Sequence, residues 1–115
     1  MDHDDRNDDL RKRIDQCKAE MAEVGVVLRG SVTRRYMPCG KTGCKCLADP
    51  PVLHGPYFQW TMKVEGKTRT VRLTEDQAAI FQTWIDNDRR LRQILARWED
   101  IGQDAAREIQ GKSSR

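Results

Sequence analysis

The first quarter of the chain has apolar residues at helical spacing. Six of them follow one another at alternating intervals of four and three residues: Leu10, Ile14, Cys17, Met21, Val24 and Leu28. This heptad pattern predicts a helix over residues 8–28, and aspartates at its start favour the positive end of the helix dipole. Cys17 lies on the apolar side, so we expect a packed core thiol and not a ligand or nucleophile.

The middle of the chain alternates between apolar and polar residues, as strands do. Residues 31–37 predict a strand, and residues 57–73 predict a β-hairpin that turns at Glu65-Gly66. A two-residue turn pairs Phe58 with Leu73 and Trp60 with Val71. One face of the hairpin is then apolar. The other face is polar and carries Tyr57, Gln59, Thr61, Lys63, Thr68, Thr70 and Arg72.

A second long helix is expected over residues 75–109. Thr74 and Gln77 have the spacing of a capping box at its start. The apolar side of this helix is predicted to follow Phe81, Trp84, Asp88, Leu91, Leu95, Trp98, Gly102, Ala105 and Ile109. Residues 110–115 are expected to form a flexible tail.

These elements together predict an α+β fold in a single domain of residues 1–115. A small zinc-stapled antiparallel sheet, a strand plus a hairpin within residues 31–73, is flanked by two long helices. The helices are expected to form an antiparallel pair resembling a coiled coil. Only 22 of the 115 residues are Leu, Ile, Val or Phe, so the core must be thin, and a metal or a partner is expected to support it.

The predicted helix register leaves apolar residues without a partner. If Leu28 lies opposite Glu75, a rise of ~1.5 Å per residue in both helices brings Leu10 opposite about residue 93. The apolar residues beyond that level are then uncovered: Leu95, Trp98, Ile101 and Ile109. We therefore expect a homodimer through the C-terminal helix, or docking to a helical partner protein.

Charge is distributed unevenly along the chain. Residues 29–73 hold 9 basic and 2 acidic side chains, whereas residues 1–28 hold 5 basic and 8 acidic ones and residues 74–115 hold 7 and 8. A basic segment with interleaved aromatic residues indicates a phosphate-bearing partner, although a solvated basic surface has the same composition. The candidate nucleic-acid contacts are Arg34, Arg35, Lys41, Lys45, Tyr57, Lys63 and Arg72.

Three cysteines and a histidine have the spacing C-x4-C-x-C-x7-H. They are Cys39, Cys44, Cys46 and His54, with Gly40 and Gly43 permitting a tight turn. These residues predict one structural zinc ion per chain, because Cys3His is a tetrahedral donor set without an open position. Asp49 is the substitute if His54 is not a ligand. Iron, a redox role and unliganded thiols remain alternatives.

The same residues resemble those of a known family. The run Tyr36-x2-Cys39-Gly40-Lys41-x2-Cys44-x-Cys46, then His54-Gly55-Pro56-Tyr57, Gly66-Lys67-Thr68 and Asn87-x-Arg89-Arg90-Leu91-Arg92, is similar to small bacterial and archaeal proteins described as a domain of unknown function. The resemblance covers roughly residues 28–101. It implies a zinc-knuckle module and a setting near transposases and other mobile elements, and it implies no activity.

The sequence thus favours a non-enzymatic, zinc-stabilised nucleic-acid-binding protein, with DNA favoured over RNA. The alternative is a helical protein–protein adaptor or an accessory subunit of a larger, transposase-like complex. An enzyme is not expected, because the carboxylates and histidines form no catalytic arrangement. Without an apolar span or a basic, apolar leader, we expect a cytoplasmic protein and no membrane contact.

Overall fold

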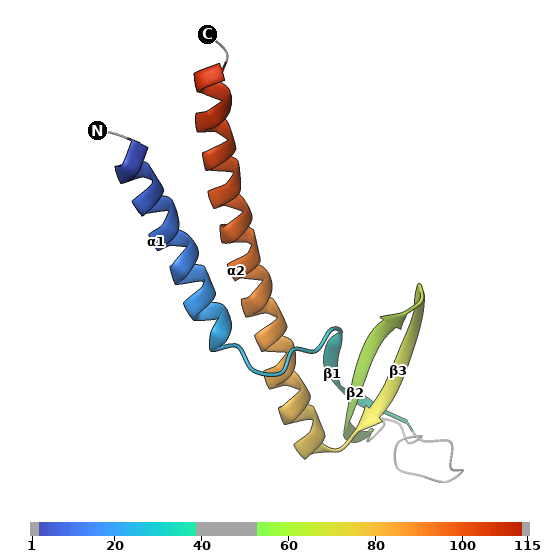
Figure 1. The fold of residues 1–115 in the computed structure, drawn as a ribbon. Coiled ribbons are helices and arrows are strands. Elements are labelled where there is room, and N and C mark those ends of the chain that lie inside the picture. Colours follow the sequence, from blue (N-terminus) through green and yellow to red (C-terminus); the bar gives the residue numbers. More distant parts are fainter. Residues whose placement is uncertain (1–2, 39–52, 114–115) are drawn as a thin grey trace. The chain divides into compact units, whose positions relative to one another are not determined.

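The computed structural model describes residues 3–38 and 53–113, with side chains over residues 7–38 and 53–111. The elements follow the order α1 (His3–Ala22), β1 (Ser31–Met37), β2 (His54–Val64), β3 (Lys67–Leu73) and α2 (Glu75–Ser113) (Figure 1). The predicted α+β class is confirmed. The chain divides into two compact units. The helical unit comprises residues up to Val27 and from Asn87 onward, and the sheet unit comprises Leu28–Asp86.

The sheet unit has three antiparallel strands in the order β1-β2-β3. The predicted hairpin is confirmed in its register, since Phe58 pairs with Leu73 and Trp60 pairs with Val71. Its turn residues Glu65 and Gly66 have φ angles of 53° and 79°. Two successive positive φ values are typical of the type I′ turn, whose twist matches that of the flanking strands.

One face of the sheet packs against the first turns of α2. The ring of Trp60 meets Phe81 edge-on at 5.3 Å between centroids, and Leu73, Ala78 and Ile85 are buried. The capping box that starts this helix is confirmed: the backbone N–H of Gln77 donates to Thr74 Oγ1 at 3.1 Å, and the N–H of Thr74 donates to Gln77 Oε1 at 2.9 Å. Apolar alternation in the hairpin and the helix cap together account for this small core.

Gly30 is confined where the chain enters β1. Its φ is +112°, and a Cβ at this position would lie 2.4 Å from the carbonyl oxygen of Thr61 and 2.7 Å from Trp60 Nε1. The same indole N–H donates to the carbonyl of Arg29 at 2.9 Å. A side chain at position 30 would therefore displace both a strand and the tryptophan that packs on α2.

Replacing Gly30 by alanine is expected to lower the free energy of unfolding by about 3 kcal/mol, from the positive φ and the steric overlap together. Gly66→Ala is the matched variant, because Gly66 also has a positive φ but has no atom within 4 Å of the added Cβ. Its expected cost is about 1–2 kcal/mol. Urea denaturation measures both, and equal losses would contradict the steric argument.

Helix α1 ends at Ala22, and not at residue 28 as predicted. Glycine and β-branched residues in the segment Val24–Val27 disfavour helix, and α1 stops before them. Backbone groups beyond the helix end instead bond to α2. The N–H of Leu28 donates to the carbonyl of Trp84 at 3.1 Å, and Asn87 Nδ2 donates to the carbonyl of Val26 at 2.8 Å.

The early end of α1 changes the register of the helical unit, in which α1 runs beside the second half of α2 (Figure 1). The prediction that Leu10 lies opposite about residue 93 is wrong, because Glu20 already contacts Arg97 and Arg13 contacts Asp104. Leu28 meets Trp84 where the prediction had Glu75. Residues 10–28 therefore extend farther along α2 than they would if α1 continued as a helix to residue 28.

The core of the helical unit consists of Cys17, Ile94 and Ile101, which are 1%, 0% and 5% exposed. The expectation of a packed Cys17 is confirmed. The predicted apolar side of α2 was wrong by one residue at two places, since it contained Leu95 and Gly102 where the buried residues are Ile94 and Ile101. Partly buried residues complete the cluster: Leu10, Ile14, Met21, Val24 and Trp98.

The set of residues expected to lack partners is therefore partly wrong. Trp98 and Ile101 pack within their own chain, because α1 extends along α2 to their level. Leu95 and Ile109 are 41% and 69% exposed. The homodimer through the C-terminal helix stays a prediction, now resting on these two residues alone.

Candidate nucleic-acid interface

The strands of the sheet unit contain cations and no acidic residue. Because side chains alternate along a strand, the register divides six cations equally between the two faces. The outer face, which points away from the first turns of α2, carries Arg35, Lys63 and Arg72. The opposite face carries Arg34, Lys67 and Arg69.

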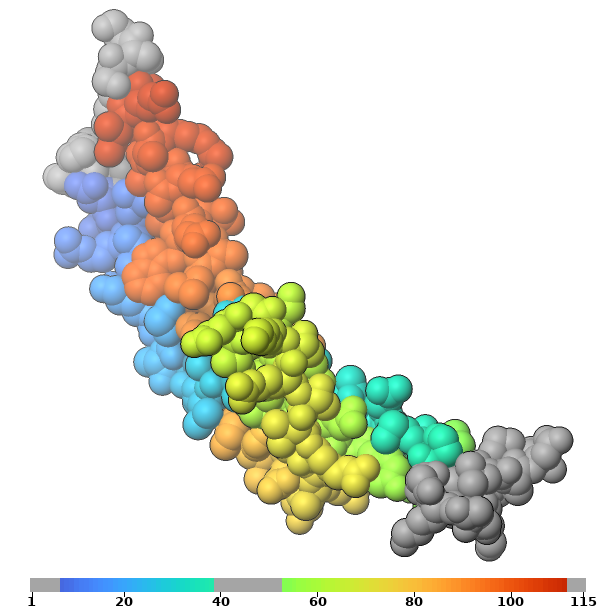
Figure 2. All heavy atoms as spheres, turned by 90° about the vertical axis from the view of Figure 1, so that its right-hand side faces the viewer, coloured from blue at the N-terminus to red at the C-terminus, as the bar shows by residue number. Residues whose placement is uncertain are grey.

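An aromatic ring lies among the cations of the outer face. Tyr57 pairs with Arg35 across β1 and β2, and Gln59 pairs with Arg72 across β2 and β3. The guanidinium carbon of Arg72 lies 4.1 Å from the centroid of the Tyr57 ring, a cation–π contact. Figure 2 shows atoms of β2 and β3, coloured green to yellow, at the surface of the sheet unit. The structure thus brings together Arg35, Tyr57 and Arg72, three of the predicted contact residues.

Arg34 is separated from that group by the alternation of β1. It pairs with Phe58, donates to the hydroxyl of Tyr36 at 2.9 Å and lies 5.6 Å from the centroid of that ring. It also lines a hollow that contains Glu75. The sequence predicted that only one of Arg34 and Arg35 could join the polar face, and the register assigns this place to Arg35.

Of the four predicted metal ligands, only His54 lies in the part of the chain that the structure describes. It is half-buried at the start of β2, opposite Met37 of β1, whereas the sequence placed it in a loop. Outside the described residues lie Cys39, Cys44, Cys46, Asp49, Lys41 and Lys45. Within the described residues, His, Cys, Asp and Glu side chains form no group of three that could hold a metal.

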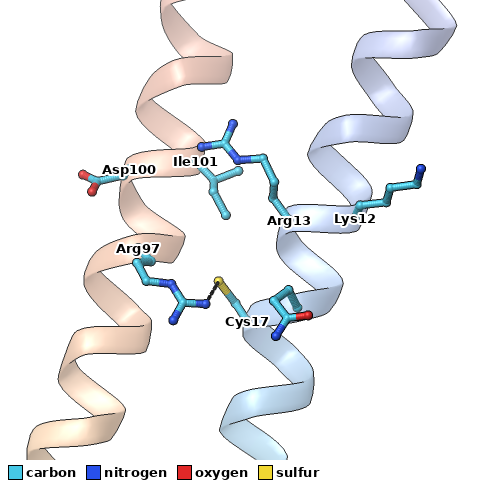
Figure 3. Close-up of a pocket in the computed structure, with 7 residues that line it drawn as sticks. Lys12, Arg13, Cys17, Arg97, Asp100 and Ile101 are labelled. Atoms are coloured by element: carbon cyan, nitrogen blue, oxygen red, sulfur yellow. Dashed lines mark hydrogen bonds between the residues drawn. The ribbon is translucent and has the colours of Figure 1, made fainter.

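Several arginines of the helical unit, in contrast, are paired with carboxylates. Glu20 Oε1 accepts hydrogen bonds from Arg97 at 2.9 Å and from Arg90 at 2.5 Å, and Arg97 also contacts Glu20 Oε2. Arg13 bonds to Asp104 at 3.0 Å. Figure 3 shows the guanidinium of Arg97 directed at the sulfur of Cys17, 3.9 Å away. These arginines hold α1 against α2.

The bonds to Glu20 change its acidity. The hydrogen bond from Arg97, followed by that from Gln16, lowers the pKa of Glu20 from 4.5 to about 2. A depressed carboxyl pKa stabilises the folded state above the unfolded pKa, and this contribution is lost as the pH falls through the folded pKa. The effect of Glu20 is therefore present above pH 4.5 and lost between pH 4.5 and about pH 2.

We expect Glu20→Gln to lower the melting temperature at neutral pH, and we expect the difference from wild type to vanish as the pH approaches about 2. Thermal denaturation followed by circular dichroism between these pH values measures it. Glu23→Gln is the control, since it removes an exposed carboxylate of the same segment that has no ion pair among the described residues. A pH-independent difference for Glu20→Gln would contradict the assignment.

Arg29, which precedes β1, was not among the contact residues predicted from the sequence. It lines a hollow together with Lys63, whose side chain belongs to the outer face of the sheet. Its position directly before Gly30 was the available signal, because a glycine next to a strand marks a sharp change in chain direction. The outer face thus has four cations in its neighbourhood: Arg29, Arg35, Lys63 and Arg72.

The fold and this surface define a small α+β protein with a basic, acid-free sheet face and a separate pair of ion-paired helices. Residues 7–82 match the model of the family "Domain of unknown function (DUF6788)", and the chain belongs to that family. Neither a curated protein nor a solved structure matches the chain. In the described part of the chain, neither helix is both long and apolar enough to cross a membrane.

Proposed function

We propose that this protein is a non-enzymatic nucleic-acid-binding module that contacts phosphates through the outer face of its sheet. The observation that carries the proposal is the absence of acidic side chains from the described strands, whose outer face presents Arg35, Lys63 and Arg72 to solvent. Described carboxylates neutralise arginines of the helical unit, and none is paired with these three cations. Exposed cations of this kind supply sequence-independent affinity for a phosphate backbone.

The spacing of the cations supports this proposal. Lys63 pairs with Thr68, and Arg72 lies four residues farther along β3. At ~3.3 Å per residue, the two side chains are roughly 13 Å apart along the sheet. One strand of duplex DNA rises ~3.4 Å per nucleotide along the helix axis, so that distance corresponds to about four nucleotide steps along the axis. A bacterial setting near mobile elements, as the resemblance implies, makes DNA the favoured partner.

Binding to duplex DNA is expected to fall with salt at a log–log slope of roughly −4 to −5, if four to six cations of the basic segment contact phosphates. Replacing Lys63 and Arg72 together by glutamine should weaken binding to all sequences alike and make the slope shallower by about two. Fluorescence anisotropy with duplex and single-stranded DNA and RNA, between about 50 and 200 mM salt, measures both effects.

The hairpin offers a matched control for this experiment. Lys67→Gln with Arg69→Gln removes the same charge from the same two-stranded hairpin, but on the opposite face. The control should leave the slope nearly unchanged. Equal losses of DNA affinity in the two double variants would mean that the effect comes from net charge alone. Absence of binding at micromolar protein would favour the alternative, a helical adaptor or accessory subunit that recognises another protein.

Tyr57 gives the proposal a second readout. Its ring contacts Arg72 on the outer face, and an aromatic ring on such a face can stack on an unpaired base. Stacking contributes ~1–3 kcal/mol per base and favours single strands over duplex. A preference of the wild-type protein for single-stranded DNA would therefore assign Tyr57 a base contact, whereas a preference for duplex would leave Tyr57 as the support of Arg72.

We further propose that Cys39, Cys44, Cys46 and His54 hold one structural zinc ion. The pairing of Met37 with His54 brings the two ends of the segment between β1 and β2 side by side. Cys39 follows Met37 by only two residues in the sequence, which supports a shared site with His54. Three thiolates and one imidazole fit the donor preference of zinc, which would stabilise the fold and leave no position for catalysis.

A further inference from the structure

A hollow of about 390 Å³ opens where β1 begins. It is lined by Arg29, Gly30, Thr61, Met62, Lys63 and Thr68. Strand pairing explains why these residues come together. Ser31 pairs with Thr61, and Lys63 pairs with Thr68. Thr61, Lys63 and Thr68 belong to the outer face and Met62 to the opposite face, and the chain preceding β1 supplies the remaining wall.

The fold fixes the main chain of Arg29, whereas its side chain forms no hydrogen bond or ion pair with the described residues. The carbonyl of Arg29 accepts the indole hydrogen bond of Trp60 at 2.9 Å, and Gly30 follows with a φ of +112°. No described carboxylate is paired with the guanidinium of Arg29 or with the ammonium of Lys63. Two cations are thus held beside one hollow, and their charges are not neutralised within the described chain.

The lining of this hollow has the chemistry of a phosphate site. Arg29 supplies a planar, multiply donating cation, and Lys63 supplies a point charge. The hydroxyl group of Thr68 adds a further hydrogen-bond donor, whereas the hydroxyl of Thr61 shares a hydrogen bond with that of Thr70 at 3.3 Å. None of the described residues that line the hollow is a carboxylate. The hollow beside Cys17 contains Asp100, and the hollow beside Arg34 contains Glu75.

We infer that this hollow binds one phosphate group of a nucleic-acid backbone, with Arg29 and Lys63 as its cationic contacts. The inference rests on the proposed function, and it adds Arg29 to the interface. It also gives the outer face two separate anchors. One is the hollow at Lys63, and the other is the group of Arg35, Tyr57 and Arg72 at the far end of the same face. Two anchors on one face fix the direction in which a strand crosses the sheet.

The test replaces Arg29 by glutamine in the full chain. The hydrogen bond that Arg29 makes in the fold is formed by its carbonyl, so the variant should fold as wild type, which circular dichroism and urea denaturation check. We expect Arg29→Gln to weaken duplex binding several-fold and to make the salt slope shallower by about one. Arg69→Gln, on the opposite face of the hairpin, is the control and should change neither.

Different results distinguish this inference from the proposed function. If Lys63→Gln with Arg72→Gln weakens binding while Arg29→Gln behaves as Arg69→Gln, the phosphate site at the hollow is overturned and the interface stands. If the wild-type protein binds no nucleic acid, both proposals fail. If Arg29→Gln weakens binding but Lys63→Gln with Arg72→Gln does not, Lys63 makes no phosphate contact, and both the outer face and the two-cation site at the hollow are overturned.

Inorganic phosphate separates a backbone contact from a site for the free anion. In NMR spectra of the wild-type protein, inorganic phosphate should shift the amide signals of Gly30 and Lys63 more than chloride does at equal ionic strength, and Arg29→Gln should abolish the difference. Inorganic phosphate should also displace DNA from the wild-type protein more effectively than chloride does. Phosphate-induced shifts without any effect of Arg29→Gln on DNA affinity would assign the hollow to a free phosphate and overturn the backbone contact.

Discussion

Removal of zinc by a chelator should unfold the sheet unit. A structural Cys3His site contributes on the order of 10 kcal/mol of apparent folding free energy, which exceeds the stability of most domains of this size. Few side chains are fully buried in this unit, where Leu73, Ala78 and Ile85 form the core, so packing alone offers little compensation. Native mass spectrometry should find one zinc per chain, and Cys44→Ser should lose both the metal and the tertiary signal of Trp60.

Cys17 provides the internal control for metal content. It is buried between α1 and α2 and is a free cysteine. We expect Cys17→Ser to retain one zinc per chain, even if the helical unit loses stability. Natively purified protein with well under one zinc per chain, whose sheet unit stays folded in chelator, would contradict the zinc proposal. Iron in place of zinc would keep the ligand set and change the metal.

Replacing Ile94 by alanine should lower the free energy of unfolding by about 3–4 kcal/mol, because a fully buried aliphatic side chain leaves both lost contacts and a cavity. Ile94 is 0% exposed and lies in the core cluster with Cys17 and Ile101. The loss should appear in urea denaturation followed at the helical signal of circular dichroism.

The neighbouring residue tests the phase of the helix. Leu95 is 41% exposed, so Leu95→Ala should cost well under about 1 kcal/mol in a monomer. If Leu95→Ala proved as costly as Ile94→Ala, the packing of α1 on the observed side of α2 would be wrong, or a second copy would cover Leu95. Sedimentation of wild type and Leu95→Ala distinguishes these two explanations.

The sheet could be predicted closely from the sequence because its signals are local. The alternation of residues 57–73 around Glu65-Gly66 allows one register that puts Phe58, Trp60 and Leu73 on one face, and the structure has that register. The capping box of Thr74 and Gln77 likewise needs only four consecutive residues. The alternation also put Lys63 and Arg72 on the polar face, but the opposite face, predicted to be apolar, carries Lys67 and Arg69.

The helix pairing was harder to predict, because it depends on where one helix stops. The heptad pattern continued through Val24 to Leu28, but the local preference of glycine and valine ended α1 at Ala22. Because of that difference, the predicted register of α1 against α2 was wrong, and Trp98 and Ile101 were expected to lack a partner in their own chain. On α2, Ile94 and Leu95 are adjacent in sequence and both apolar, so only packing against α1 decides which of them is buried. Arg29 was missed because its place depends on the tertiary contact of Trp60.

The position of β3 has a consequence for association between molecules. The strand order makes β3 an edge strand, whose outward backbone groups could pair with a strand of another copy. Lys67, Arg69 and Arg72 place cations on both faces of this short edge, and two such edges would repel each other. An anion bound to the outer face would neutralise Arg72 and leave Lys67 and Arg69 charged. The edge would therefore stay protected against aggregation while the outer face is occupied.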